Sequence, residues 1–441
     1  MRQSLIDRIV TLIGAPHVST GIDCSPYVLE GRTPEAVVRP GTTKEVAGVL
    51  AAMAEAGVPV TPWGGGTKMT IGAPPAQLGL VLCLSRMSRL IDHEPGDLTA
   101  TAQAGMTVAA FQAELGRRGQ WLSLDPPQPE RATLGGVLAA AASGPRRHLY
   151  GTPRDLLIGL TLVLADGSVV KGGGKVVKNV AGYDIPKLAI GSFGTLGVIV
   201  EATVKLRPRP DADRLVVARF DRLKDAGQGA RAIVGSDLIP SAVDLVDGEG
   251  LRALGSVAEG AGLLIGVDGT SEQVDWQCAE IPRLLGGLGL AEHRVLDGAT
   301  RDAVWAARGE LSRRVFREPA AIMRWSVLPV QVADQIEQAG GTAQRNGLRA
   351  SFAAHAGVGV VTAALSGEGA AADAVVATLV DWRAQVRAGG GHALLEWAPL
   401  AIKERVPVWE PPGAAHRVMR RIKDQLDPRG ILNPGRWSGG P

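Results

Sequence analysis

The stretch Pro59–Lys68, PVTPWGGGTK, is the most informative segment of the chain. Its apolar start ends at three consecutive glycines, and Thr67 and Lys68 follow. Glycine in a strand or helix interior costs about 0.5–1 kcal/mol per residue, so this run indicates a backbone that curls tightly. The N–H groups of such a curl converge and bind an anion, and a phosphate fits well. Taken alone, Gly64–Thr67 is equally consistent with a surface turn.

Two common phosphate-binding motifs are excluded. A P-loop requires Gly-x-x-x-x-Gly-Lys-Ser/Thr, but the nearest candidate, Gly172–Lys175, is followed by Val176 and has Val169 in the first glycine's place. A dinucleotide fingerprint requires Gly-x-Gly-x-x-Gly, and Met69 stands where its last glycine would be. The glycine run therefore belongs to another kind of phosphate loop.

The composition indicates a globular protein of two or three domains. The chain has 441 residues, of which 45% are hydrophobic, so each domain can bury a well-developed core. Charged residues make up 21% and the formal net charge is +3, so we expect no nucleic-acid partner. The 58 glycines indicate many tight turns and close backbone approaches.

The apolar segments indicate a cytoplasmic protein without a transmembrane segment. The run Ala132–Gly144 is shorter than the roughly 20 residues that cross a bilayer. Charged residues interrupt Met1–Gly14, which excludes a signal peptide and predicts an amphipathic helix. The apolar face of this helix carries Leu5, Ile9, Leu12 and Ile13.

The cysteines exclude two further kinds of site. Cys24, Cys83 and Cys278 are scattered and odd in number. They fit neither a disulfide framework nor the ligand spacing of a zinc or iron–sulfur centre. An iron–sulfur cluster, if the function needs one, must come from another chain.

The glycine run follows a predicted βαβ unit. Val37–Pro40 and Val58–Thr61 are expected strands, and Thr42 or Thr43 caps a helix over Glu45–Glu55. The loop then lies at the carboxyl end of the second strand, where α/β sheets bind ligands. Further expected elements before residue 208 are strands Leu80–Leu84, Leu98–Gly105 and Leu196–Leu206, helix Val108–Gly116, and a hairpin of Leu156–Leu164 with Val169–Lys171.

A domain boundary is expected at Pro208-Arg209-Pro210. Alternating strands and helices beyond it predict a second, α+β domain that ends near Pro412. Its expected strands are Leu215–Phe220, Leu263–Asp268 and Met323–Leu328, and its expected helices are Gln273–Gly286 and Val330–Ala339. The tail, Ala414–Gly435, begins as a basic helix and continues into the segment Asp427–Arg436, DPRGILNPGR.

Four more segments rich in glycine and hydroxyl residues lie in the first 210 residues. Each alone is equally consistent with an ordinary turn, but together they could line a long, flat, phosphate-bearing ligand. They are Asp125–Gly144, Gly151–Asp155, Lys178–Asp184 and Gly191–Ile199.

In order and spacing, these segments resemble the FAD-binding domain of the vanillyl-alcohol oxidase/p-cresol methylhydroxylase (PCMH-type) superfamily. Gly64–Thr67 matches the family's pyrophosphate loop, and Ala132–Gly136 matches its second phosphate and ribose segment. Gly191–Ile199 matches the loop and strand beside the flavin, and Asp427–Arg436 matches the carboxyl-terminal signature. Within the branch of FAD-linked 2-hydroxy-acid dehydrogenases, Lys178–Asp184 and Gly191–Ile199 are most similar to the FAD-binding accessory subunit of bacterial glycolate oxidase.

The resemblance implies an α+β fold in which a PCMH-type FAD-binding domain of two subdomains, residues 1–208, precedes an α+β substrate or cap domain, residues 209–412. Residues 413–441 would form a helix and tail that return to the FAD domain. We expect the FAD to be non-covalent, because the pyrophosphate loop offers Trp63 and Thr67 but no His or Cys before Cys83. The residues expected to contact FAD are Gly64, Gly65, Gly66, Thr67, Pro126, Thr133, Gly135, Gly136, Gly144, Gly191, Ser192, Thr195, Gly197, Ile199 and Asn433.

The second domain lacks the metal motif of the stand-alone dehydrogenases that it resembles. Their His-x-Gly-Asp-Gly-Asn-x-His is replaced by His355–Thr362, HAGVGVVT, and their later Glu-His-Gly by Glu396–Ala398, EWA. Valine cannot ligate a metal, so we expect no metal site. His355 is expected to be packed or hydrogen-bonded, with a role as ligand or catalytic base as the alternative.

Arg324, within MRWSV, is the candidate for binding a substrate carboxylate. A guanidinium binds a carboxylate through two parallel hydrogen bonds, and a strand would hold it rigidly. An ordinary interface or surface arginine is the alternative, and Arg308, Arg313 and Arg314 are weaker candidates for the same role.

The resemblance implies an FAD-dependent oxidoreductase subunit that acts on glycolate or a similar small 2-hydroxy acid. Its expected partners are a homologous flavin subunit and an iron–sulfur subunit of a glycolate oxidase-type complex, through which it could be peripheral to the inner membrane. The alternatives are a self-sufficient, metal-free FAD-linked 2-hydroxy-acid dehydrogenase and a flavin-binding subunit with a structural role only.

Overall fold

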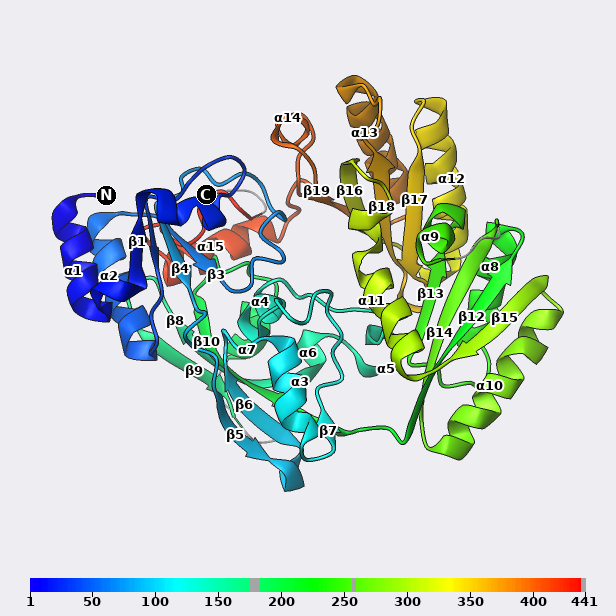
Figure 1. Ribbon diagram of the computed structural model, residues 1–441. Helices are drawn as coiled ribbons and strands as arrows, with labels where there is room; N and C mark the ends of the chain where they lie inside the picture. The colour runs from blue at the N-terminus through cyan, green and yellow to red at the C-terminus, as the bar shows by residue number, and fades with distance from the viewer. Residues whose placement is uncertain (175–182, 256–258, 438–441) are drawn as a thin grey trace. The chain divides into compact units, whose positions relative to one another are not determined.

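A computed structural model describes residues 1–174, 183–255 and 259–437 (Figure 1). By its internal contacts the chain divides into two compact units. Unit 1 comprises Met1–Ser143, Thr152–Arg209 and Pro411–Pro441, and unit 2 comprises Gly144–Gly151 and Pro210–Glu410. Of the predicted segment Lys178–Asp184, all but the last two residues lie outside the described residues.

Unit 1 contains a four-stranded sheet in the order β1-β2-β4-β3. The strands are β1 (Val18–Thr20), β2 (Ala36–Val38), β3 (Val60–Trp63) and β4 (Leu80–Cys83). Both β2 and β3 run parallel to β4, so the predicted βαβ crossover is present and skips one strand. The crossover helix α2 (Thr43–Ala56) begins at Thr42, whose hydroxyl accepts from the Glu45 N–H at 3.1 Å, and ends at Gly57 in the left-handed conformation.

The predicted N-terminal helix is confirmed as α1 (Gln3–Ile13), which packs on α2. Ile9 and Ile13, one turn apart, are buried in the core that α2 shares. Leu12, predicted on the same face, is 40% exposed, because the helix docks along the line of Ile9 and Ile13 and leaves Leu12 at its margin.

A second sheet of unit 1 is antiparallel, in the order β5-β6-β10-β8-β9. Its strands are β5 (Leu90–Glu94), β6 (Thr99–Gln103), β8 (Leu157–Val163), β9 (Val169–Gly173) and β10 (Val198–Lys205), and a separate short ladder joins β7 (Gln120–Trp121) to β11 (Arg207–Pro208). The predicted β8–β9 hairpin is confirmed. The helices are α3 (Val108–Gly116), α4 (Leu134–Ala139), α6 (Pro153–Leu156), α7 (Ile185–Ala189) and α15 (His416–Leu426).

Unit 2 is built on an eight-stranded antiparallel sheet in the order β15-β12-β14-β13-β17-β18-β16-β19. The strands are β12 (Ala212–Phe220), β13 (Ala242–Val246), β14 (Ala261–Gly269), β15 (Leu290–Leu296), β16 (Pro319–Ser326), β17 (Ala350–His355), β18 (Val360–Ser366) and β19 (His392–Trp397). The helices are α5 (Arg147–Tyr150), α8 (Leu223–Val234), α9 (Gly248–Ala253), α10 (Ser271–Gly286), α11 (Gly298–Arg314), α12 (Val332–Arg345), α13 (Ala372–Ala388) and α14 (Leu400–Lys403).

The two faces of this sheet differ in how they are covered. Helices α8, α10, α12 and α13 cover one face of the sheet (Figure 1). They bury the main apolar core, in which Trp325 and Trp382 are fully buried. On the other face α9 and α11 contribute Leu251 and Leu311 to a smaller cluster. This second face carries the polar side chains described below.

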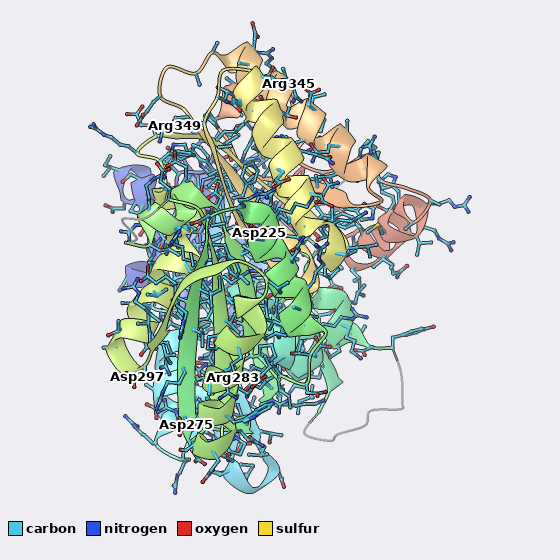
Figure 2. The ribbon with its side chains drawn as sticks, turned by 90° about the vertical axis from the view of Figure 1, so that its right-hand side faces the viewer. Asp225, Asp275, Arg283, Asp297, Arg345 and Arg349 are labelled. Atoms are coloured by element: carbon cyan, nitrogen blue, oxygen red, sulfur yellow. The ribbon has the colours of Figure 1, made fainter. Side chains whose placement is uncertain are left out.

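The outer surface of unit 2 is charged. Figure 2 shows charged side chains along the helices and loops that cover the sheet, with Asp225, Asp275, Arg283, Asp297, Arg345 and Arg349 labelled. Among the described residues, no helix has the length and apolar content that spanning a membrane would require.

Candidate functional site

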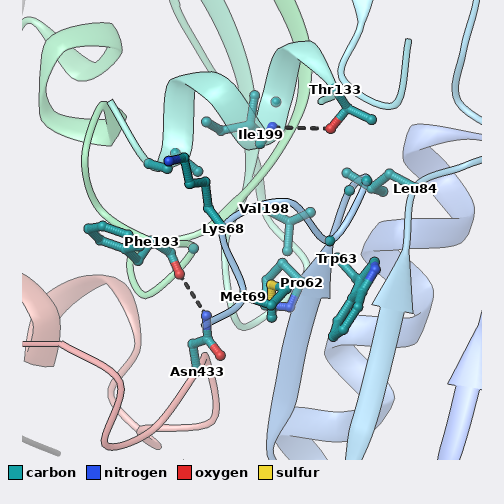
Figure 3. Close-up of a pocket in the computed structure, with 18 of the residues that line it drawn as sticks. Pro62, Trp63, Lys68, Met69, Leu84, Thr133, Phe193, Val198, Ile199 and Asn433 are labelled. Atoms are coloured by element: carbon teal, nitrogen blue, oxygen red, sulfur yellow. Dashed lines mark hydrogen bonds between the residues drawn. The ribbon is translucent and has the colours of Figure 1, made fainter. Parts of the chain in front are cut away.

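A pocket in unit 1 is lined by loops that are far apart in the sequence (Figure 3). The glycine run at the end of β3 faces the start of α4, with the start of β10 and the C-terminal tail on the remaining sides. The predicted residues that line the pocket are Gly64, Gly65, Gly66, Thr67, Thr133, Gly135, Gly136, Gly197, Ile199 and Asn433. Lys68 and Arg436 also line it, and they add positive charge.

The glycine run packs directly on the chain that precedes α4. A Cβ added to Gly65 would lie 1.6 Å from the carbonyl oxygen of Arg131, and one added to Gly64 would lie 2.2 Å from Thr133 Oγ1. Gly65 therefore requires glycine because two backbone segments meet there, whereas at Gly64 a Cβ would collide with the side chain of Thr133.

Gly136 has a different environment. Thr133 caps α4, since its hydroxyl accepts from the Gly136 N–H at 3.3 Å. A Cβ on Gly136 would have only Thr133 Oγ1 nearby, at 3.1 Å. Because Gly136 lines the pocket, a larger side chain there would extend into the pocket rather than into the core.

Asn433 offers an unused acceptor to the pocket. Its backbone is left-handed (φ 49°) and its side chain is 5% exposed. Nδ2 donates to the carbonyl oxygen of Phe193 at 2.6 Å (Figure 3). Oδ1 is buried and has no hydrogen-bond partner within the described chain. Buried polar atoms are almost always paired, so this oxygen fits the N–H or O–H of a ligand.

The C-terminal tail fixes the loop beside the glycine run. Arg436 is 3% exposed and donates to the carbonyl oxygens of Met69 and Ile71, both at 2.5 Å, and of Ala73 at 2.9 Å. Burial lowers the pKa of Arg436 to about 10. The guanidinium remains charged at neutral pH and holds this loop in place.

The tail itself is anchored by a buried ion pair. Lys423 Nζ lies 2.5 Å from Asp427 Oδ2 and also donates to the carbonyl oxygens of Thr195 and Leu432. The Val60 N–H donates to the Ile431 carbonyl at 2.8 Å, and the Asn433 N–H donates to the Val60 carbonyl at 2.9 Å. The tail therefore pairs with the start of β3, the strand that leads into the glycine run.

Other predicted contact residues lie elsewhere. Gly191, Ser192 and Thr195 line a second cavity of unit 1, about 300 Å³ in volume, together with residues of α15. Pro126 and Gly144 line neither cavity, and Gly144 belongs to unit 2. Any role of these five residues toward a cofactor stays a prediction.

Known structures share this fold. The structure of p-cresol methylhydroxylase superposes on this chain with a TM-score of 0.77 at 17% sequence identity. The match covers 98% of this chain and 96% of p-cresol methylhydroxylase. An alkyldihydroxyacetonephosphate synthase superposes with a TM-score of 0.75 over 99% of the chain and 86% of its own length, also at 17% identity. The fold is that of the PCMH-type FAD-binding proteins.

Family models match most of the chain. The FAD binding domain matches residues 34–173, and the C-terminal domain of FAD linked oxidases matches residues 209–437. The chain belongs to the FAD-linked oxidases, and it is an FAD-dependent oxidoreductase. The glycine cradle, the two pocket cations and the unused Asn433 oxygen fit the phosphates and polar edge of this cofactor.

Curated relatives are similar over nearly the whole chain. The glycolate oxidase subunit GlcD of Bacillus subtilis is 28% identical over 91% of this chain and 88% of its own length. A D-lactate dehydrogenase of Archaeoglobus fulgidus is 28% identical over 98% of this chain and 99% of its own length.

A polar cluster lies on the less covered face of the unit 2 sheet. Asp244 on β13 is fully buried, and its Oδ1 lies 2.8 Å from His355 Nδ1. Its Oδ2 lies 2.8 Å from Nε of Arg308, which is on α11. Burial disfavours ionisation of Asp244, but Arg308 and His355 outweigh it and hold the pKa of this carboxyl below its ordinary value. Sequence analysis missed Asp244, since a single Asp in a short strand forms no motif.

Arg324 lies on the same sheet face as His355. Arg324 pairs with Thr362 across β16–β18, and His355 pairs with Val360 across β17–β18. Because Val360 and Thr362 are two residues apart on β18, they point to the same face of the sheet, and so do their partners His355 and Arg324. The Arg324 guanidinium is 31% exposed and lies 3.9 Å from the Glu396 carboxylate. Two positions of the lost metal motif, Val360 and Thr362, lie on β18 between them. Among the described residues, no three His, Cys, Asp or Glu side chains are grouped as metal ligands.

His148, on α5, packs against this cluster. Its segment, Gly144–Gly151, belongs to unit 2 because Arg146 pairs with Asp213 at 2.5 Å and with Asp268 at 2.6 Å. A Cβ added to Gly357 would lie 2.3 Å from His148 Nδ1. Burial lowers the pKa of His148, although the Asp244 carboxylate opposes this shift.

We predict that Gly136→Val weakens FAD binding at least tenfold, because its branched side chain would occupy the pocket. The matched control is Gly286→Val on α10, an exposed helical glycine with open space around its Cβ position. The measurements are the ratio of flavin to protein absorbance and the Tm of each apoprotein. Full FAD occupancy in Gly136→Val, with an unchanged Kd, would contradict the pocket as the cofactor site.

We predict that His148 makes the protein less stable in acid. Its pKa in the folded state lies below the value of about 6.5 expected when unfolded, so the unfolded state binds more protons and stability falls as the pH drops below about 6.5. When the pH falls from about 7.5 to 5.5, the Tm of His148→Gln should therefore fall less than the Tm of the wild type. The difference should be roughly 2–4 °C for each kcal/mol of stability that protonation of His148 removes. His293→Gln, at an exposed position of β15, serves as control. Equal acid sensitivity of His148→Gln and wild type would refute the prediction.

Proposed function

We propose that this chain is the FAD-binding subunit of a glycolate oxidase-type complex, which oxidises glycolate or another small 2-hydroxy acid and passes the electrons to an iron–sulfur partner. The observation that carries the proposal is a contrast between the two units. Unit 1 has a glycine-lined pocket with an unused acceptor on Asn433, whereas unit 2 has valines and a threonine where stand-alone dehydrogenases have metal ligands.

The names of the relatives support the substrate class. They include glycolate oxidase subunits of Bacillus subtilis and Escherichia coli and D-lactate dehydrogenases, and glycolate and D-lactate are both 2-hydroxy acids. Such a substrate carries one carboxylate and one adjacent hydroxyl. A site for it needs a cation for the carboxylate and a group that accepts the hydroxyl proton.

In the proposed mechanism the pocket residues of unit 1 would hold FAD: Gly64–Gly66 and Thr133–Gly136 would bind its phosphates, and Asn433 Oδ1 would accept from one of its N–H or O–H groups. FAD, when bound, accepts two electrons from the substrate. Arg324 would bind the substrate carboxylate with the guanidinium edge that Glu396 leaves open. The β16 strand limits the motion of its backbone.

The proposed partners follow from what this chain lacks. Its three scattered cysteines cannot hold an iron–sulfur cluster, so electrons must pass to an acceptor outside the chain. A cluster-bearing subunit, together with a homologous flavin subunit, fits that need. Peripheral attachment to a membrane would then depend on those partners.

A second candidate function is a self-sufficient, metal-free dehydrogenase. It is favoured by the pair of His355 with the buried Asp244, because a carboxylate–imidazole pair is a common proton acceptor that needs no metal. The two candidates differ in whether the isolated chain reduces its own flavin.

We predict that the flavin is bound without a covalent link. Among the described residues that line the pocket there is no His or Cys, the side chains that commonly carry such a link. Acid precipitation of the yellow protein should release all flavin to the supernatant, as measured by its absorbance. Flavin that stays with the denatured pellet would contradict this expectation.

We predict that the isolated FAD-loaded chain, mixed anaerobically with glycolate or D-lactate, keeps its flavin oxidised or bleaches far more slowly than the complex turns over. Co-purification from the native host should recover a homologous flavin subunit and a cysteine-rich iron–sulfur protein. Stopped-flow absorbance of the flavin is the measurement.

Three outcomes separate the candidates. Rapid bleaching of the isolated chain without added metal would favour the self-sufficient dehydrogenase, and Arg324→Ala should then raise KM before it lowers FAD content. Full activity of a reconstituted complex that contains the FAD-free chain would favour a structural subunit. Slow bleaching alone, with fast turnover only in the FAD-loaded complex, supports the primary proposal.

A further inference from the structure

Strand β15 lies at one margin of the unit 2 sheet and has an open edge. In the part of the chain that the structure describes, β15 pairs with β12 on one side and with no strand on the other (Figure 1). The side chains from Ala291 to Val295 are exposed. An open strand edge presents backbone N–H and C=O groups with which a further strand can pair.

The opposite margin of the sheet is covered by the chain itself. On β19 the Leu395 N–H donates to the Val408 carbonyl oxygen at 3.0 Å, and the Ala393 N–H donates to the Glu410 carboxylate at 2.9 Å. The segment after α14 therefore protects the β19 margin, whereas the β15 margin is left available to a partner.

The open edge carries two opposite charges on one face. Glu292 and Arg294 are two residues apart on β15, so they point to the same face, and their side chains are 58% and 63% exposed. The Glu292 carboxylate lies 3.9 Å from Arg219 Nε on β12 and 4.0 Å from Arg294 Nε. Both separations exceed the length of a hydrogen bond, so both charges are open to a closer partner.

A second copy of β15 matches this edge in one register. Two copies joined edge to edge by a two-fold axis run antiparallel, and residues opposite each other point to the same face. With the axis at His293, Glu292 of each copy lies opposite Arg294 of the other. An axis at Glu292 would oppose two carboxylates, and an axis at Arg294 would oppose two guanidinium groups. Charge therefore selects the register centred on His293.

The neighbouring strand supports the same register. Arg219 is opposite Glu292 on β12, so in the pair the carboxylate would lie between Arg219 and Arg294 of the second copy. The pairing of β15 with β12 shifts between Glu292 and Leu290, which keeps the regular part of the edge short. A short strand pair buries less surface than a permanent interface, so we expect a dimer that dissociates on dilution.

We propose that β15 pairs with β15 of a second copy of this chain, antiparallel and edge to edge, with His293 at the two-fold axis. The pairing joins the two eight-stranded sheets of unit 2 into one continuous sheet. The proposal goes beyond the proposed function and does not depend on it, because it concerns only the association of this chain with itself.

The first test is analytical ultracentrifugation of the FAD-loaded full chain over a range of concentrations. The wild type should change from monomer to dimer as its concentration rises. Glu292→Lys and Arg294→Glu should each weaken the dimer by about tenfold or more, because each places like charges opposite one another. The matched controls are Asp381→Lys and Arg387→Glu, at exposed positions of α13, which packs on β19 at the other margin of the sheet. They should dimerise like the wild type.

Mixing the two β15 variants separates lost pairing from lost folding. In a dimer of Glu292→Lys with Arg294→Glu, the introduced lysine faces the introduced glutamate, and the native arginine faces the native glutamate. The mixture should therefore dimerise although each variant alone is monomeric. A monomeric wild type at every concentration, a dimer that both substitutions leave intact, or a mixture that stays monomeric would overturn the proposal.

The second test cross-links the axis. His293→Cys places a thiol opposite its own copy, with the two Cβ atoms about 5 Å apart, whereas the thiols of Val295→Cys would be four residues apart along the strands, about 13 Å. Both variants also carry Cys278→Ser, because Cys278 is only partly buried. A bis-maleimide shorter than 13 Å should cross-link the first variant and not the second, as seen on a denaturing gel. Equal cross-linking of both, or none at residue 293, would contradict the register.

Hydrogen exchange identifies the partner that covers the edge. The amides of residues 291–295 in the isolated FAD-loaded chain should become protected as its concentration rises. Protection that appears only when a homologous flavin subunit is added would assign the edge to that subunit and overturn the pairing of two identical copies.

Discussion

The buried pair of Lys423 with Asp427 fixes the C-terminal tail that borders the glycine-lined pocket. Asp427 also accepts from the N–H groups of Ile431 and Leu432, which turns the tail so that it pairs with Val60 on β3. Burial lowers the pKa of Lys423, and Asp427 opposes that shift. An unpaired buried charge costs about 3–5 kcal/mol, so each partner depends on the other. Through this turn the tail brings Asn433 to the pocket.

The elements with local signals are those that the sequence predicts well. α2 has a Thr42 cap and a Gly57 stop, and α3 begins after Thr107 and spans the predicted residues Val108–Gly116. The strand β13 is not predicted, because Asp244 interrupts its short apolar run, whereas the equally buried β4 and β14 contain uninterrupted apolar runs. The assembly of eight strands depends on long-range pairing that no short window of sequence contains.

Some residues of the candidate site are likewise predicted from a local motif, and others become visible only in the three-dimensional structure. The glycine run is visible locally, but the reason that Gly65 must be glycine, its approach to Arg131, appears only in three dimensions. Asn433 is predicted only through the resemblance of the whole tail, since a lone Asn carries no signal. Asp244 escaped detection because its partner His355 is 111 residues away, and an isolated carboxylate in an apolar strand forms no motif. Physical pairing, and not sequence proximity, defines that cluster.

The order of the chain also constrains when the pocket can exist. The glycine run and α4 are made early, but Asn433 and the Arg436 guanidinium that holds the 69–73 loop come more than 200 residues after β10. During synthesis all of Pro210–Glu410 is made between β3 and the tail, so Val60 has no partner from Ile431–Asn433 in that time. The pocket with Asn433 and Arg436 in place therefore forms only after the tail has been made, and until then the edge of β3 at Val60 is open to other strands.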